Sequence, residues 1–175
     1  MPATETTLSA LERNWEMVES AFEEVDEATM SSRPNDESNS MSWLLWHMTI
    51  VVDRYIHPRF QGTPTLWIAD GWNEKFGMAP DPDDFGMGWS ADKVSDWQPP
   101  SKEVLLGYFQ AATSATRKYL QPLTAVDLDR QIPFPNQPAT RSVADALGIL
   151  VWDNIVHGGQ IAYLRGYYRG MGWHR

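Results

Sequence analysis

The segment SVADALGILVWDNIVHGGQIAYLRGYY, residues 142–168, carries the most regular hydrophobic pattern of the chain. Its apolar positions recur every three or four residues, which is the spacing of one face of an α-helix. The positions of this seam are Val143, Leu147, Leu150, Asn154, His157, Ile161, Leu164 and Tyr168. Two consecutive positions are polar, although the seam is expected to face the core. Ser142 is a favourable N-cap, and Gly170 is expected to end the helix.

Three further segments show the same helical spacing, over residues 8–25, 39–58 and 101–122. Pro58 and Pro122 are expected to end the second and third helices, because proline lacks the N–H that an α-helix needs. No segment shows the alternation that is typical of a β-strand. The sequence therefore predicts an all-α fold, a four-helix bundle, in a single domain over residues 1–175.

Residues 61–100 have a different composition, rich in glycine, proline and aspartate. We expect them to form a long crossover between the second and third helices, with one short helix over residues 66–76. A connection of this length is uncommon in a compact domain and often forms a pocket. The crossover also holds several of the nine tryptophans, which are expected mainly to cover one end of the bundle.

The composition excludes several classes of function. Acidic residues outnumber basic ones by 23 to 14, and the resulting net charge of −9 argues against nucleic-acid or anionic-membrane partners. The chain has no cysteine and can form no disulfide, so any thiol must come from another molecule. The N-terminus shows no signal-peptide pattern, and no apolar run approaches the ~20 residues that span a bilayer. A cytoplasmic location is expected.

The chain has four histidines, and two of them lie in the middle of predicted helices. His57 and His174 lie at a helix end and near the C-terminus, where exposure is expected. His47 and His157 lie on or beside apolar seams, where an imidazole needs polar partners. Asp153 precedes His157 by four residues and therefore lies on the same helix face.

A histidine from a facing helix completes a set of three possible metal ligands, His47, Asp153 and His157. Two imidazoles and one carboxylate with an open fourth position are typical of catalytic zinc, and other divalent transition metals also accept them. The alternative is a metal-free core, in which Asp153 only orients a hydrogen-bonded His157. The spacing alone leaves both interpretations open.

Two motifs, WLLWHM at residues 43–48 and HGGQIAYLRG at residues 157–166, resemble the DinB/YfiT-like superfamily, as does DGWNEKFGM at residues 70–78. This resemblance implies a four-helix bundle with a divalent metal, held by a histidine of the second helix and two residues spaced by four on the last. His47 and His157 match two of these ligands. Asp153 stands where the commonest pattern has histidine, although the thiol-dependent maleylpyruvate isomerase type has a carboxylate there.

The resemblance implies a metal-dependent transferase or isomerase that acts on a small-molecule substrate with a low-molecular-weight thiol such as mycothiol or bacillithiol. Zinc or nickel is the expected metal, and a homodimer is the expected assembly. The alternatives are a non-catalytic bundle with a vestigial site, which acts as a binding or stress module, and a metal-dependent hydrolase.

Several further residues are candidates for binding the substrate or thiol. They are Trp46, Arg54, Trp67, Trp72, Asn154 and Arg165. For the two arginines, a solvated position at a helix end is the alternative interpretation, because arginine is mostly exposed. Gly158 and Gly159 interrupt the last helix without ending its seam, so they are expected to allow close approach of a neighbouring helix.

Overall fold

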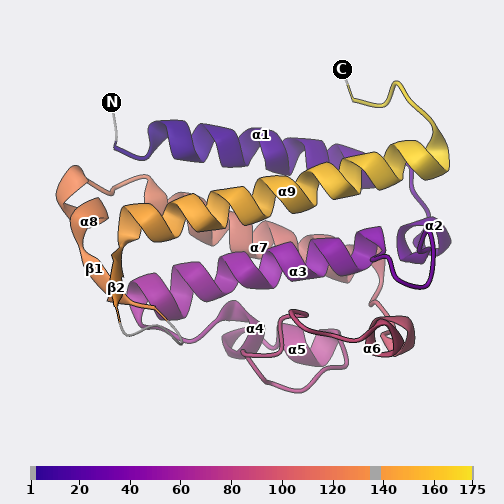
Figure 1. Ribbon diagram of the computed structural model, residues 1–175, viewed down its shortest axis with the longest axis horizontal. Helices are drawn as coiled ribbons and strands as arrows, with labels where there is room; N and C mark the ends of the chain where they lie inside the picture. The colour runs from indigo at the N-terminus through magenta and orange to yellow at the C-terminus, as the bar shows by residue number, and fades with distance from the viewer. Residues whose placement is uncertain (1–2, 135–138, 175) are drawn as a thin grey trace.

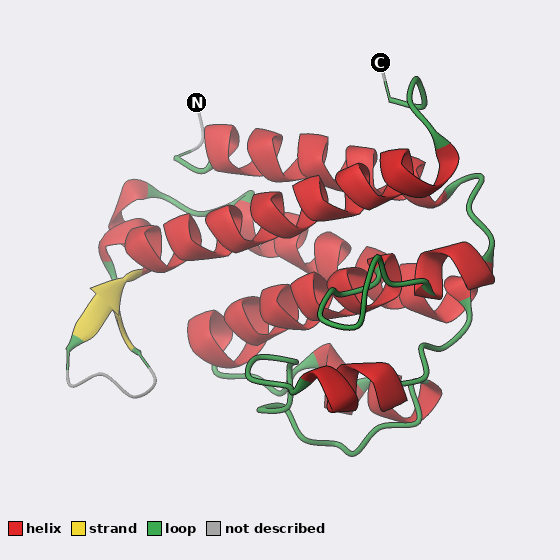
Figure 2. Cartoon of the chain, turned by 45° about the vertical axis from the view of Figure 1, so that its right-hand side comes forward, coloured by secondary structure: helices red, strands yellow, loops and turns green. Residues whose placement is uncertain are grey.

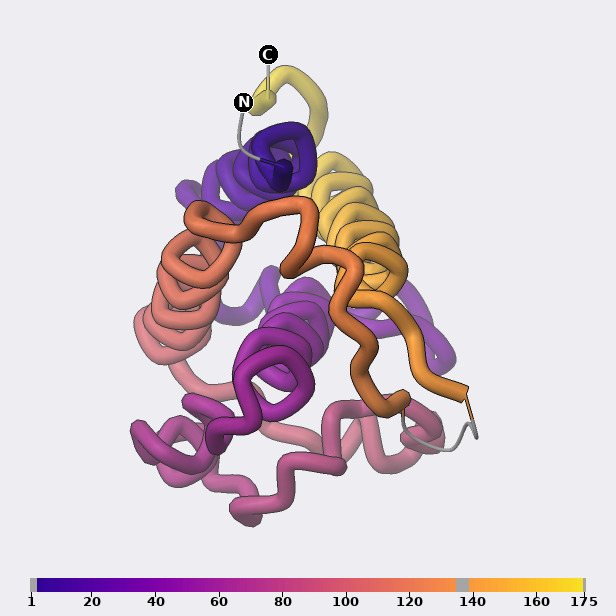
Figure 3. Tube along the Cα trace, turned by 90° about the vertical axis from the view of Figure 1, so that its left-hand side faces the viewer, coloured from indigo at the N-terminus to yellow at the C-terminus, as the bar shows by residue number. Residues whose placement is uncertain are grey.

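The computed structural model describes residues 3–134 and 139–174. Four long helices lie side by side along the molecule (Figure 1). They are α1 (Glu5–Phe22), α3 (Met41–Arg54), α7 (Lys102–Leu120) and α9 (Val143–Arg169). Helix α9 packs on α1 and α3, while α7 packs on the other side of the same two helices, as the end-on view shows (Figure 3). The predicted all-α fold is confirmed.

Short elements connect and extend the long helices. The short helices are α2 (Glu27–Ser31), α4 (Leu66–Ala69), α5 (Trp72–Lys75), α6 (Ala91–Asp96) and α8 (Ala125–Asp129). Strands β1 (Gln131–Pro133) and β2 (Thr140–Ser142) form a small antiparallel hairpin, with Ile132 opposite Arg141 (Figure 2). The expectation of no strand is wrong here, because three-residue strands are too short to show alternation.

Serine caps define the beginnings of three long helices. The side-chain oxygens of Ser40, Ser101 and Ser142 each accept a hydrogen bond from the backbone N–H three residues later. This arrangement satisfies one of the N–H groups that a helix leaves unpaired at its start. The predicted beginnings of these helices are therefore confirmed, and so is the end of α9 at Gly170.

The second long helix does not end at Pro58. It continues as a π-helix, η1 (Tyr55–Gln61), that contains Pro58 and is capped by Gly62 with a φ of 69°. In an α-helix, the ring of this proline would clash with the carbonyl four residues earlier. The wider π turn carries the chain past the proline, and the predicted stop is corrected by one further turn.

A buried carboxylate fixes the crossover to the helices. Asp53, on α3, is fully buried and accepts hydrogen bonds from the backbone N–H groups of Leu66 and Trp67, at 2.9 Å each. It also accepts from the hydroxyl of Tyr108, at 2.8 Å, and from Nδ1–H of His57, at 2.6 Å. Four donors thus compensate the loss of water around this charge. His57 is half-buried, so the expectation of an exposed histidine is wrong.

The crossover covers α3 and α7 along one side of the molecule (Figure 2). The short helix expected over residues 66–76 is divided into α4 and α5 by Gly71, whose φ is 67°. Trp67 is fully buried against Tyr108, and Trp97 packs on Trp46. The aromatic residues of the crossover therefore extend the core.

Candidate metal centre

The packing of α3 against α9 brings three possible metal ligands together. They are His47 from α3 and Asp153 and His157 from α9. One ligand atom from each residue lies within 4.8 Å of the other two. The rings of His47 and His157 are perpendicular, with centroids 4.8 Å apart. The convergence expected from the helical spacing is therefore present in the structure.

His47 is held by the crossover. Its Nδ1–H donates to the backbone carbonyl of Phe85 at 2.5 Å, and its ring stacks on Trp43 with centroids 4.9 Å apart. Because a carbonyl oxygen only accepts hydrogen bonds, Nδ1 carries the proton and Nε2 keeps its lone pair. The side chain is buried, so its orientation is set by these contacts. Nε2 is therefore the atom available to a metal.

Gly86 lets the crossover approach His47 this closely. It has a φ of 92°, and a Cβ at this position would lie 2.6 Å from Trp43 and 3.3 Å from Nδ1 of His47. Only glycine meets both requirements, because other residues rarely adopt this backbone conformation and have no space for a side chain here. Apart from this glycine, the sequence has no feature that indicates contact between the crossover and His47.

His157 is oriented from its own helix. Its Nδ1–H donates to Oε1 of Gln160 at 2.7 Å, while Nε2 lies 3.5 Å from Oδ1 of Asp153. A metal-ligating histidine commonly donates its second N–H to such a partner, which fixes the tautomer. Gln160 is absent from the residues predicted for the site, although its i, i+3 spacing from His157 is visible in the sequence.

Asp153 is the residue that favours a metal over a metal-free core. Its Oδ2 is buried and has no hydrogen-bond partner among the residues that the structure describes. An unpaired buried carboxylate oxygen is unfavourable unless a cation or a donor lies beside it. Tetrahedral bonds of 2.0–2.2 Å place ligand atoms about 3.4 Å apart, so a pair at the 4.8 Å limit would close by about 1.4 Å. The three residues therefore fit a divalent ion.

The two imidazoles differ in proton affinity. Burial lowers the pKa of His47, and the Phe85 carbonyl only partly opposes this effect. Burial also acts to lower the pKa of His157, but the nearby carboxylate of Asp153 and the hydrogen bond to Gln160 outweigh it and the pKa is raised. A metal that bound these residues would therefore displace a proton from His157 more often than from His47.

A cavity of about 700 Å³ lies beside the three ligands and is lined in part by His47 and Asp153. Arg54, one of the residues predicted to bind the substrate or thiol, also lines this cavity. Its guanidinium pairs with Asp83 at 3.0 Å and lies 3.8 Å from the ring centroid of Phe85. Only 12% of the Arg54 side chain is exposed, so the alternative of a solvated helix end is wrong for this residue.

Three tryptophans of the candidate set lie away from this cavity. Trp46 and Trp67 are fully buried in the core, and Trp72 packs on Tyr108 and over Gly107 of α7. Their positions follow from the crossover, which folds back onto α3 and α7. The structure thus places these side chains in the packing of the crossover.

Asn154 and Arg165, the two polar candidates for substrate binding on α9, also do not line the cavity. Asn154 is fully buried, accepts a hydrogen bond from Nε1–H of Trp15 at 2.8 Å and donates to the carbonyl of Met48 at 3.3 Å. It therefore connects α9 with α1 and α3. Arg165 is buried, with its guanidinium 5.7 Å from the ring of Trp173, so its expected alternative as a solvated helix end is wrong.

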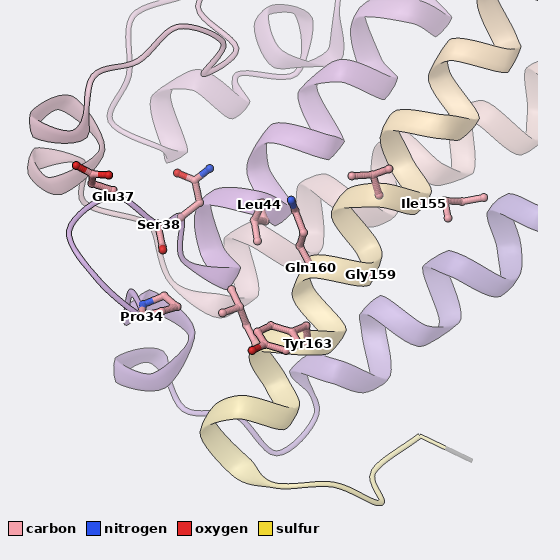
Figure 4. A pocket seen from close by; sticks show the side chains of 11 residues that line it. Pro34, Glu37, Ser38, Leu44, Ile155, Gly159, Gln160 and Tyr163 are labelled. Carbon is pink, nitrogen blue, oxygen red and sulfur yellow. The ribbon is translucent and has the colours of Figure 1, made fainter.

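The adjacent glycines Gly158 and Gly159 of α9 differ in their surroundings. A Cβ on Gly158 would overlap the side chain of Asn14, which donates to the carbonyl of Asn154. The expected close approach is confirmed at Gly158 and wrong for Gly159, which has nothing within 4 Å. Gly159 instead lies in a second groove of about 750 Å³, where Gln160 and Tyr163 face the segment that contains Ser38 (Figure 4).

The fold and the site define a class of helical proteins with a candidate divalent-metal centre between two packed helices. The sequence model of the DinB superfamily matches residues 10–161. The chain belongs to the DinB superfamily, which confirms the resemblance read from the sequence.

A conserved protein from Enterococcus faecalis has a similar crystal structure, with a TM-score of 0.86 and 24% sequence identity. The match covers 98% of this chain and 99% of that chain, and at this identity it supports the fold alone. No curated protein matches the chain. Within the described residues, the structure contains no helix with the length and apolar character needed to cross a bilayer.

Proposed function

We propose that the protein is a divalent-metal-dependent enzyme in which His47, Asp153 and His157 hold the ion. Zinc and nickel are the expected metals, because both accept imidazole and carboxylate ligands. The observation that carries the proposal is the buried Oδ2 of Asp153, which has no partner among the described residues and lies beside a cavity. A cation at this point compensates that oxygen and uses the lone pairs of both imidazoles.

The proposed reaction is a transfer or isomerisation that uses a low-molecular-weight thiol of the mycothiol or bacillithiol kind. The resemblance to thiol-dependent members of the superfamily supports this reaction, and the absence of cysteine means that the thiol comes from another molecule. A bound metal would lower the pKa of such a thiol and make the thiolate available near neutral pH. The cytoplasmic location expected from the sequence is part of this proposal.

The residues around the centre have separate tasks in this proposal. Phe85 and Gln160 each bind Nδ1 of one imidazole and so leave Nε2 of that ring for the ion. Arg54 lies on the cavity wall, where it can orient a polar group of the bound molecule. The cavity of about 700 Å³ is large enough for a small-molecule substrate.

Metal analysis of protein purified without a histidine tag tests the centre. After reconstitution with zinc or nickel, we expect about one ion per chain in the wild type and a large loss in His157→Ala. A wild-type protein that takes up neither ion would contradict the metal centre. Metal-loaded protein that shows no turnover with any low-molecular-weight thiol would contradict the thiol chemistry alone.

We also propose a homodimer formed through the outer face of α9. This face carries a stripe of exposed large apolar side chains, with Trp152 67%, Tyr163 71% and Tyr167 59% exposed. Ile155 and Val156 lie between them on the same face. Exposed large apolar side chains gathered on one helix face are typical of protein interfaces.

A further inference from the structure

The cavity beside the metal ligands carries an unusual concentration of positive charge. Arg54 from α3, Arg59 from η1 and Arg141 from β2 all line it. The chain has only 14 basic residues against 23 acidic ones, so a cavity lined by three arginines differs in charge from the acidic protein as a whole. The carboxylates in the lining are Asp83 and Asp153.

Neither carboxylate neutralises Arg59. Asp83 pairs with Arg54, and Asp153 belongs to the metal ligands. Arg141 pairs at 2.8 Å with Asp145, whose side chain is 55% exposed. Among the residues that the structure describes, Arg59 forms no ion pair with a carboxylate. A divalent ion would add further positive charge, so the cavity favours an anion although the protein as a whole is acidic.

Aromatic rings hold two of the guanidinium groups in place. The Cζ atoms of Arg59 and Arg141 lie 5.0 and 4.8 Å from the ring centroid of Phe134, and Arg59 also lies 4.2 Å from that of Tyr55. Such contacts restrict the side chains and cover the faces of the guanidinium groups, whereas the N–H donors lie in the plane of each group, at its edges. Two restrained guanidiniums beside one ring offer donors that match a carboxylate or a phosphate.

We propose that Arg59 and Arg141 form a subsite for the anionic group of the substrate, a carboxylate or a phosphate. The apolar part of the molecule then lies against Phe134 and Trp152, and its reacting end points to the metal ligands. This assignment of the substrate class rests on the proposed function, because it takes the cavity as the reaction site. The binding of the anion itself needs only the two arginines and the aromatic wall.

Three small probes test the subsite on metal-free protein. Benzoate carries a carboxylate, phenyl phosphate carries a phosphate, and benzamide is a neutral analogue of benzoate. By isothermal titration calorimetry, we expect at least one of the two anions to bind about 10-fold or more tightly than benzamide, since charge-assisted hydrogen bonds are lost with the amide. The anion that binds more tightly shows whether the subsite prefers a carboxylate or a phosphate.

Substitutions locate the binding. Arg59→Gln and Arg141→Gln are each expected to weaken the better anion about 10-fold or more, whereas the exposed Arg13→Gln on α1 should leave its affinity unchanged. Arg59→Lys, which keeps the charge without the planar fork, should show an intermediate loss. Circular dichroism checks that each variant is folded. Equal loss in Arg13→Gln would show a general charge effect and overturn the subsite.

Other outcomes also overturn the proposal. Equal binding of benzamide and both anions would remove the role of charge. Anion binding that appears only after loading with zinc, and is unchanged in the two arginine variants, would make the anion a metal ligand. The proposed function fails separately: protein that binds benzoate through Arg59 but takes up no metal contradicts the metal centre and leaves the anion subsite intact.

Discussion

The Nδ1–H of His47 donates to the backbone carbonyl of Phe85 at 2.5 Å. The proposed metal ligand on α3 is thus oriented by the crossover, whereas His157 is oriented by Gln160 of its own helix. Both contacts leave Nε2 as the atom with a free lone pair. The centre is therefore arranged by two partners that lie outside the ligand set.

Removal of the Gln160 side chain should weaken metal binding without unfolding the protein. Gln160 is exposed, so Gln160→Ala leaves packing largely unchanged while His157 loses the partner that fixes its tautomer. We expect a decrease in zinc affinity of about 10- to 100-fold, measured by competition with a chromogenic chelator. Gln110→Ala, at an exposed position of α7, is the matched control and should keep the wild-type affinity. Equal affinity in all three proteins would contradict the role of Gln160.

Metal should stabilise the wild type and not a variant that lacks the carboxylate. A ligand that binds only the native state raises its melting temperature. We expect zinc to raise the melting temperature of the wild type, and EDTA to reverse this effect. Asp153→Asn, which keeps the shape of the side chain, should lose most of the increase. A wild type whose melting temperature responds to neither zinc nor EDTA would support a vestigial site.

The ion pair between His57 and Asp53 should make stability depend on pH. The hydrogen bond to Asp53 raises the pKa of His57 above its ordinary value of 6.5, against the opposing effect of burial. Because the folded pKa is the higher one, the stabilisation is fully present below about pH 6.5 and is lost as the pH rises through the folded pKa.

The difference in unfolding free energy between the wild type and His57→Gln isolates this effect, since His47 and His157 remain in both proteins. It should be largest at pH 5.5–6 and decrease towards pH 8.5, as measured by urea denaturation at each pH. A difference that is constant over this range, or that increases with pH, would contradict the assignment.

The neighbouring glycines of α9 offer a matched pair for stability. Gly158→Ala places a methyl group against Asn14 and should destabilise the protein by about 1–3 kcal/mol, because the packed interface must shift. Gly159→Ala meets no atom within 4 Å and should stabilise the helix by roughly 0.5–1 kcal/mol. Chemical denaturation measures both changes, and equal effects would contradict the close contact at Gly158.

The apolar stripe on α9 should control the state of assembly. Tyr163→Glu places a charge in the middle of the stripe and is expected to convert the dimer to a monomer, as measured by sedimentation velocity. Val126→Glu, at a position 80% exposed on α8, is the control and should leave the dimer intact. A wild type that sediments as a monomer at all concentrations would rule out the proposed homodimer.

The convergence of His47, Asp153 and His157 could be predicted from the sequence because helical spacing is a local property. Asp153 and His157 share a face of α9 whatever surrounds them, and the position of His47 on an apolar seam is equally visible. The partner that orients His47 could not be predicted in this way. The contact from Phe85 uses a backbone carbonyl, which any residue type provides, so no sequence pattern indicates it.

The crossover and its surroundings could not be predicted in the same way. Asp53 is buried because two backbone N–H groups of α4 fold onto it, a long-range contact with no local signal. The tryptophans, expected in part at a pocket, follow this fold into the core. Arg59 lines the cavity after Pro58 has changed the helix to a π turn, and Arg141 lines it from a strand too short to recognise.

The glycine at position 86 has a consequence for engineering. Its backbone fits between the indole of Trp43 and the ring of His47, so the crossover and the second long helix form one interlocked unit. A crossover taken from a relative cannot be exchanged as a cassette unless it brings a glycine in the same backbone conformation at this point. Libraries that diversify the crossover to change substrate preference should hold Gly86 constant, because a side chain there would displace Trp43 and His47 before it altered the cavity.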